Sequence, residues 1–167
     1  MKMRLFTLAL ILFTANGFAQ SGNDVKFTFG PELGFATGSF GNSHSIGIGG
    51  TVQLEIPVKE RTQATIMSGI ILYNGKSVRP GEKKKGRNII PLRAGVKQFL
   101  VGGVYGGLQL GVGFLNQGGG TAFSYAPQVG YEFFTKNGKG IDLSGRYDVY
   151  SKNGSIGAFV FRLGFTL

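Results

Sequence analysis

The chain has 167 residues, with 18 Lys and Arg against 8 Asp and Glu, a formal net charge of +10, 30 glycines and no cysteine. The lack of cysteine excludes disulfides, thiolate metal sites and cysteine nucleophiles, and a single histidine makes a metal site improbable. A basic balance of this kind suits nucleic acid or anionic lipid as a partner.

The N-terminus has the three-part layout of a secretory signal peptide. Lys2 and Arg4 precede an apolar run over residues 5–15, and small residues stand at Gly17 and Ala19. We expect cleavage after Ala19, so that residues 1–19 are the signal peptide and residues 20–167 form one exported domain. Because an exported protein rarely meets nucleic acid, the charge favours anionic lipid headgroups, and no nucleic-acid partner is expected.

The exported part alternates between turn-rich segments and segments with the period of two that is typical of β-strands, and it contains eight candidate strands. In chain order they cover residues 25–35, 45–56, 63–73, 90–100, 104–114, 123–133, 141–150 and 159–167. In the last segment, every odd position from Phe159 to Leu167 is large and apolar. The third segment is apolar on both faces, so its register stays open.

Three prolines, at positions 31, 91 and 127, lie inside these segments. Proline cannot donate a hydrogen bond to a strand ladder, and a closed barrel has no edge strand to accommodate it. We therefore expect bulges or different strand limits at these points.

Charged residues within the segments fall on one face only. That face carries five basic and five acidic residues: Lys26, Arg93, Lys97, Arg146, Arg162, Glu32, Glu55, Glu132, Asp142 and Asp148. An Arg or Lys facing lipid at the membrane midplane costs about 2–4 kcal/mol. This partition predicts an all-β fold: an eight-stranded antiparallel up-and-down transmembrane barrel with its charges inside.

Charges inside a narrow barrel need partners, because an unpaired buried charge is strongly destabilising. We interpret five of these residues as an interior charge network: Glu32, Arg93, Lys97, Arg146 and Arg162. Closure of the barrel makes the first and last strands neighbours, so we expect Glu32 to pair with Arg162 or Arg146.

The longest connection, residues 74–87, has a net charge of +5. Its basic residues are Lys76, Arg79, Lys83, Lys84, Lys85 and Arg87. Two interpretations stay open, contact with lipopolysaccharide phosphates and a solvated loop without a partner. The single histidine, His44, is interpreted as an exposed loop residue.

The chain resembles the small eight-stranded outer-membrane β-barrel domain family of Gram-negative bacteria. The resemblance rests on the signal peptide, the segment from Tyr131 to Tyr150 and the alternating C-terminal strand with Phe165, although Leu167 stands where such families usually end in phenylalanine. It implies an outer-membrane location, outer-membrane lipid and lipopolysaccharide as partners, assembly by the barrel-assembly machinery, and a monomer.

These observations favour a non-enzymatic barrel with a packed, charge-paired interior and a structural, adhesive or surface-binding role. We predict no catalytic residue, no cofactor and no metal site. Alternatives are a narrow pore or small-molecule uptake barrel, a lipid A-modifying enzyme, and a soluble lipocalin-like carrier with an apolar interior.

Overall fold

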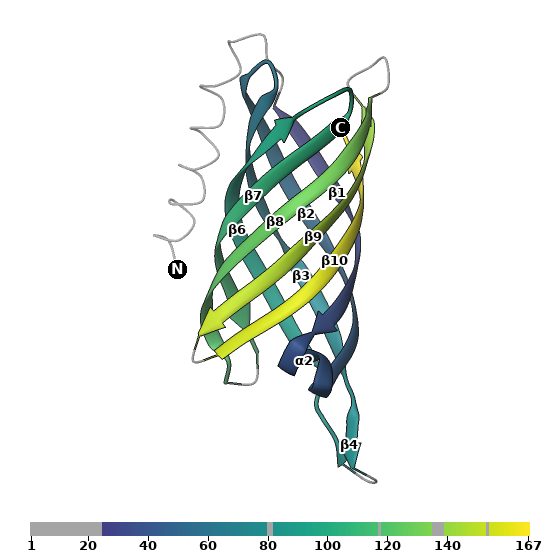
Figure 1. Ribbon diagram of the computed structural model, residues 1–167, viewed down its shortest axis with the longest axis vertical. Coiled ribbons are helices and arrows are strands. Elements are labelled where there is room, and N and C mark those ends of the chain that lie inside the picture. Colours follow the sequence, from purple (N-terminus) through teal and green to yellow (C-terminus); the bar gives the residue numbers. More distant parts are fainter. Residues whose placement is uncertain (1–24, 80–81, 117, 135–138, 153) are drawn as a thin grey trace, which may run out of the picture.

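The computed structural model describes residues 25–79, 82–116, 118–134, 139–152 and 154–167, and for residues 78, 79, 82, 83 and 134 it describes the backbone only. The predicted signal peptide, residues 1–19, lies outside the described residues. The described chain forms a closed barrel of eight antiparallel strands (Figure 1). The predicted fold class is therefore confirmed.

Each barrel strand pairs with its neighbours along the chain, and β1 pairs with β10 to close the barrel. The strands are β1 (Lys26–Thr37), β2 (His44–Lys59), β3 (Thr62–Gly75), β6 (Arg87–Phe99), β7 (Val104–Leu115), β8 (Gly120–Phe134), β9 (Gly140–Lys152) and β10 (Gly154–Thr166). Most of them extend a few residues beyond the limits predicted from the sequence.

The two ends of the barrel differ. One end carries both ends of the described chain and the connections β2–β3, β6–β7 and β8–β9, and we call it the turn end (Figure 1). The opposite end, the loop end, carries the short helix α2 (Gly38–Ser43) and a projecting hairpin made of β4 (Ser77–Arg79) and β5 (Glu82–Lys83). The helix and the hairpin were not predicted, because the helix buries a single residue, Phe40, and so shows no apolar period.

The exterior of the barrel is apolar and the interior polar, as the charge partition predicts. On β7, Leu110 is 48% exposed, whereas its neighbour Gln109 is 1% exposed. A soluble lipocalin-like barrel requires charges outside and an apolar interior, so this arrangement excludes it. Phe29 and Phe165 lie against each other on the outside of the β1–β10 seam, with ring centroids 6.1 Å apart.

The structure resolves the open register of the third segment. Gln63 and Thr65 of β3 point inward near the turn end, and Met67, Ile71 and Tyr73 point inward further along. The strand is apolar on both faces because the interior itself becomes apolar toward the loop end.

The three prolines require neither a bulge nor a shorter strand, so that expectation was wrong. Pro31 keeps its partner Gly50 in β2, and only the pairing toward β10 is interrupted, between Phe29–Phe165 and Glu32–Arg162. Pro91 and Pro127 likewise keep a partner in β7 and lose pairing toward β3 and β9. The register is the same on both sides of each gap, so the barrel accommodates each proline by leaving a ladder position unpaired on one side.

Candidate functional site

Inside the turn-end half of the barrel, charges gather around Lys97. Its Nζ atom lies 2.7 Å from Glu132, 3.1 Å from Glu55 and 3.5 Å from Asp142. Asp142 also accepts hydrogen bonds from the Tyr105 hydroxyl at 2.6 Å and from Arg162 at 2.9 Å. Glycine makes room for the bulky ring here, because a Cβ on Gly130 would lie 2.5 Å from Tyr105.

A second cluster lies closer to the loop end. The Arg146 guanidinium donates to both oxygens of Glu32, at 2.5 and 2.7 Å, and its Nε donates to Asp148 at 2.8 Å. Arg93 reaches the same Asp148 at 2.8 Å and lies over the Tyr150 ring. The structure thus selects Arg146 from the two predicted partners of Glu32.

Two glutamines extend the first cluster. Gln53 donates to Glu55 and accepts from Arg162 and Gln109 at 3.1 Å each. The structure brings the five predicted network residues into this interior, and their carboxylate partners include Glu55, Glu132, Asp142 and Asp148. Lys26 contacts Glu132 at 3.5 Å, so every interior cation has an acidic partner.

Toward the loop end, the interior is closed by an apolar cluster rather than by charges. Its buried members are Phe40, Ile71, Tyr73, Ile89, Leu115, Ala122, Tyr150, Ala158 and Val160. Phe40 of α2 stacks on His44 with centroids 4.5 Å apart and meets the Tyr73 ring at 5.1 Å. The helix therefore inserts one aromatic side chain into the mouth of the barrel.

The interpretation of His44 as an exposed loop residue was wrong. The side chain is buried under Phe40, and Nδ1 lies 2.8 Å from the Ser43 hydroxyl. His44 lies at the rim, before Ile46, the first outward apolar residue of β2. Burial, together with the Arg87 guanidinium, holds the pKa of His44 below its usual value of 6.5.

The basic residues of the predicted loop lie at the loop end, around and beyond the mouth. Lys76, Lys84 and Lys85 are exposed, and Arg87 is half-buried as the first residue of β6. For Arg79 in β4 and Lys83 in β5, only the backbone is described, so their predicted roles stay untested. Among the described side chains, every carboxylate lies in the interior or, for Glu60, at the turn end.

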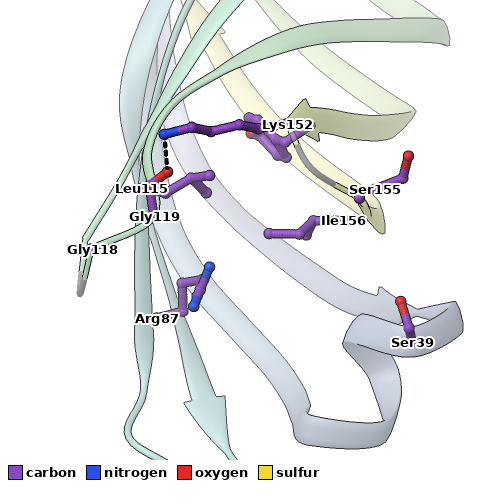
Figure 2. A pocket seen from close by; sticks show the side chains of 10 residues that line it. Ser39, Arg87, Leu115, Gly118, Gly119, Lys152, Ser155 and Ile156 are labelled. Atoms are coloured by element: carbon purple, nitrogen blue, oxygen red, sulfur yellow. Dashed lines mark hydrogen bonds between the residues drawn. The ribbon is translucent and has the colours of Figure 1, made fainter.

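Lys152 joins this set, although the sequence analysis did not select it. It is the last residue of β9, and its Nζ donates to the carbonyl oxygen of Gly119 at 2.9 Å. Together with Arg87 it lines a pocket of about 390 Å³ at the mouth (Figure 2). Nothing in the sequence links two cations 65 positions apart. The fold brings the start of β6, the β7–β8 connection and the end of β9 to one pocket.

The described residues contain neither a membrane-spanning helix nor a metal-binding cluster. None of the helices in the described part of the chain is long and apolar enough to cross a membrane. Across the same residues, no group of three or more His, Cys, Asp or Glu side chains could hold a metal ion.

Comparison with known proteins shows similarity at the level of the fold. No family model and no curated protein matches the chain. Among solved structures, Neisserial surface protein A has a TM-score of 0.62 at 13% identity, with 88% of this chain and 99% of that chain covered. The attachment invasion locus protein Ail of Yersinia pestis has a TM-score of 0.57 at 13% identity, covering 88% and 100% of the two chains.

The outer membrane protein AlkL, studied in lipid bilayers, has a TM-score of 0.55 at 13% identity and covers 87% of this chain and 90% of that chain. The chain therefore has the fold of the small eight-stranded outer-membrane barrels, as its resemblance to that family implies.

Proposed function

We propose that the protein is a closed, non-enzymatic barrel of the outer membrane whose loop end binds saccharides that carry phosphate or sulfate groups. Lipopolysaccharide phosphates are the first candidate ligand. One observation carries the proposal: the interior cations all have acidic partners, whereas the loop-end cations have none among the described side chains. Protein interiors neutralise their charges, but uncompensated charge at a surface attracts an oppositely charged ligand.

The apolar exterior supports a location in the membrane. Large apolar side chains such as Leu110 and Phe161 are about half exposed on the barrel wall, and water would contact them in a soluble protein. AlkL, a solved structure with this fold, is an outer membrane protein, which supports the same location. We include outer-membrane lipid and the barrel-assembly machinery as partners, and a monomeric state, in the proposal.

A sulfated glycan is the second candidate ligand. A structure of Ail has been determined in complex with the heparin analogue sucrose octasulfate. In this chain the exposed Lys76, Lys84 and Lys85 supply closely spaced positive charge near the projecting hairpin. Sulfate and phosphate esters share the charge-assisted hydrogen bonding that such a surface offers.

The packed interior supports a closed barrel rather than a pore. Among its largest fully buried side chains are Arg93, Lys97, Tyr73, Tyr105 and Tyr150. An eight-stranded barrel has an interior just wide enough for side chains to fill. We expect planar bilayers with the reconstituted protein to show little conductance, and frequent large conductance steps would favour the pore alternative.

The surroundings of His44 support the non-enzymatic part of the proposal. Asp148, a carboxylate of the interior cluster closer to the loop end, is bound by Arg93 and Arg146. A triad needs a free carboxylate to orient the histidine. Mass spectrometry of lipid A from cells with and without the protein tests this part, because a modifying enzyme would change its mass.

The binding proposal is tested by removing two lysine charges at one end of the barrel and, in a control variant, two at the other end. The loop-end variant is Lys84→Gln/Lys85→Gln, and the matched control is Lys59→Gln/Lys139→Gln at the turn end, where both lysines are also exposed. The refolded proteins are titrated with purified lipopolysaccharide and, separately, with sucrose octasulfate.

We expect the loop-end variant to lose about tenfold in affinity at low salt and the turn-end variant to retain wild-type affinity. Binding should weaken as salt rises, because exposed charges are screened within about 10 Å at 0.1 M. Which of the two ligands binds identifies the source of the anionic groups. Equal losses in both variants, or no binding by the wild type, would contradict the proposal.

A further inference from the structure

We infer that the pocket between Arg87 and Lys152 is a subsite for one phosphate or sulfate monoester carried on a sugar ring. The inference rests on the proposed function and names the chemical group that the loop end takes at one defined position. The exposed Lys84 and Lys85, which follow the hairpin, offer a polyanion charge alone, whereas this pocket surrounds a ligand with side chains from several strands.

Two cations from distant strands converge on one backbone turn. Arg87 begins β6 and Lys152 ends β9, and both reach the β7–β8 connection (Figure 2). Lys152 Nζ donates to the Gly119 carbonyl oxygen at 2.9 Å, and Arg87 Nη1 lies 3.4 Å from the position that a Cβ on Gly119 would occupy. The two positive charges therefore flank the same small space.

In the described part of the turn, Gly118, Gly119 and Gly120 put no side chain into that space. Gly118 and Gly120 have φ values of 78° and 63°, which favour glycine. A Cβ on Gly120 would lie 2.5 Å from Lys152 Nζ. The Gly119 carbonyl thus holds the ammonium group at the edge of the pocket.

Among the described side chains, no carboxylate neutralises the charge of this pair. Arg87 has no carboxylate partner among the described residues, and its buried Nε has no hydrogen-bond acceptor there. Lys152 has one carbonyl partner, which carries no net charge. A phosphate or sulfate group offers three oxygens, and a guanidinium binds such a group with two parallel hydrogen bonds.

The rest of the lining suits a sugar ring. Tyr150 also lines the pocket, but its side chain is buried and its hydroxyl is engaged with Asp148, so the ligand would meet only its edge. Leu115 and Ile156 add apolar surface, and Ser39 and Ser155 bring hydroxyls from the side of α2 and β10 (Figure 2). A sugar has apolar C–H faces and polar edges, and the volume of about 390 Å³ lies within the common range of about 300–1,000 Å³ for small-ligand sites.

The test uses monosaccharide esters, which are too small to contact the pocket and the exposed lysines near the hairpin at the same time. Full-length refolded protein is titrated with glucose 6-phosphate and glucose 6-sulfate, with glucose as the uncharged control. The variants are Arg87→Gln, Lys152→Gln and the charge-keeping Arg87→Lys, and the matched control is Lys84→Gln/Lys85→Gln. Heat-modifiable gel mobility verifies that each variant is folded.

We expect the wild type to bind at least one of the two esters and not glucose. Arg87→Gln and Lys152→Gln should each weaken ester binding about tenfold, Arg87→Lys should restore part of it, and the hairpin variant should bind like the wild type. Competition by lipopolysaccharide against the bound ester would assign the group to a lipid headgroup, and no competition would assign it to a soluble saccharide.

The inference is overturned if the wild type binds no ester, or if both pocket variants bind it as tightly as the wild type. Failure of the proposed function looks different, because it removes binding of lipopolysaccharide and sucrose octasulfate. Ester binding without polyanion binding would leave the subsite standing and refute the wider surface. Polyanion binding without ester binding would do the reverse.

Discussion

The interior and the loop end treat positive charge in opposite ways. Inside, Lys97 has three carboxylates within 3.5 Å, and Arg146 is held by Glu32 and Asp148. At the mouth, Arg87 and Lys152 have no acidic partner among the described side chains. Burial explains the difference, since a charged group buried away from water needs an oppositely charged partner, whereas a charged group in contact with water does not. The paired charges are thus expected to govern stability, and the unpaired ones binding.

The largest loss of stability is expected when the centre of the interior network is removed. Lys97→Met leaves Glu55, Glu132 and Asp142 without their shared cation, which should cost toward the upper end of about 3–5 kcal/mol. Urea unfolding in lipid vesicles, followed by gel mobility, measures the change. Lys59→Met at the exposed turn end is the control, and an equal effect there would remove the distinction between paired and unpaired cations.

A single-partner deletion should cost less. In Glu32→Gln, Arg146 loses a two-pronged contact but keeps Asp148, so we expect a destabilisation near the lower end, about 3 kcal/mol. The same unfolding assay applies, with the exposed Glu60→Gln as the matched control. Unchanged stability in Glu32→Gln would show that this ion pair is dispensable.

A cation placed on the apolar exterior would face lipid, where it has neither an acidic partner nor water. Leu110→Arg on β7 should cost about 2–4 kcal/mol if the side chain lies near the membrane midplane. Val104→Arg, on the same face of the same strand but at the turn end, should cost about 0–1 kcal/mol. Equal costs would contradict the proposed position of the apolar belt.

Protonation of the rim histidine should have a smaller effect. Because burial and Arg87 lower the pKa of His44 in the folded state, the unfolded chain binds more protons below pH 6.5. The contribution of neutral His44 to the free energy of unfolding is therefore fully present above pH 6.5 and is lost as the pH falls below 6.5. Melting curves at pH 7.5 and 5.5 should differ more for the wild type than for His44→Gln, since the chain has no other histidine.

The smallest effect on stability is expected at the exposed Lys84 and Lys85, which are proposed to bind ligand. Lys84→Gln/Lys85→Gln should change the free energy of unfolding by no more than about 0.5 kcal/mol, because both side chains are exposed. A substantial loss of stability would mean that the hairpin lysines are structural and that the loop end is not a free binding surface.

Much of the fold could be predicted because the side-chain period of a strand is local. Alternation placed the strands and separated Leu110 from Gln109, and selection against charge on an apolar wall assigned all ten charged residues to one face. The same rule suggested five members of the network, and the structure adds Glu55, Glu132, Asp142 and Asp148 as their carboxylate partners. Pairing of Glu32 with a basic residue followed from barrel closure, although the sequence left Arg146 and Arg162 as equal choices.

Tertiary structure alone decided the rest. The choice of Arg146 as the partner of Glu32 depends on how the strands are staggered around the barrel. The apolar character of both faces of β3 depends on the apolar cluster that fills the interior near α2. The burial of His44 depends on one residue, Phe40, folding back over it. The Arg87–Lys152 pocket combines residues from separate strands at a glycine turn, a proximity that closure of the barrel creates and that local sequence patterns do not encode.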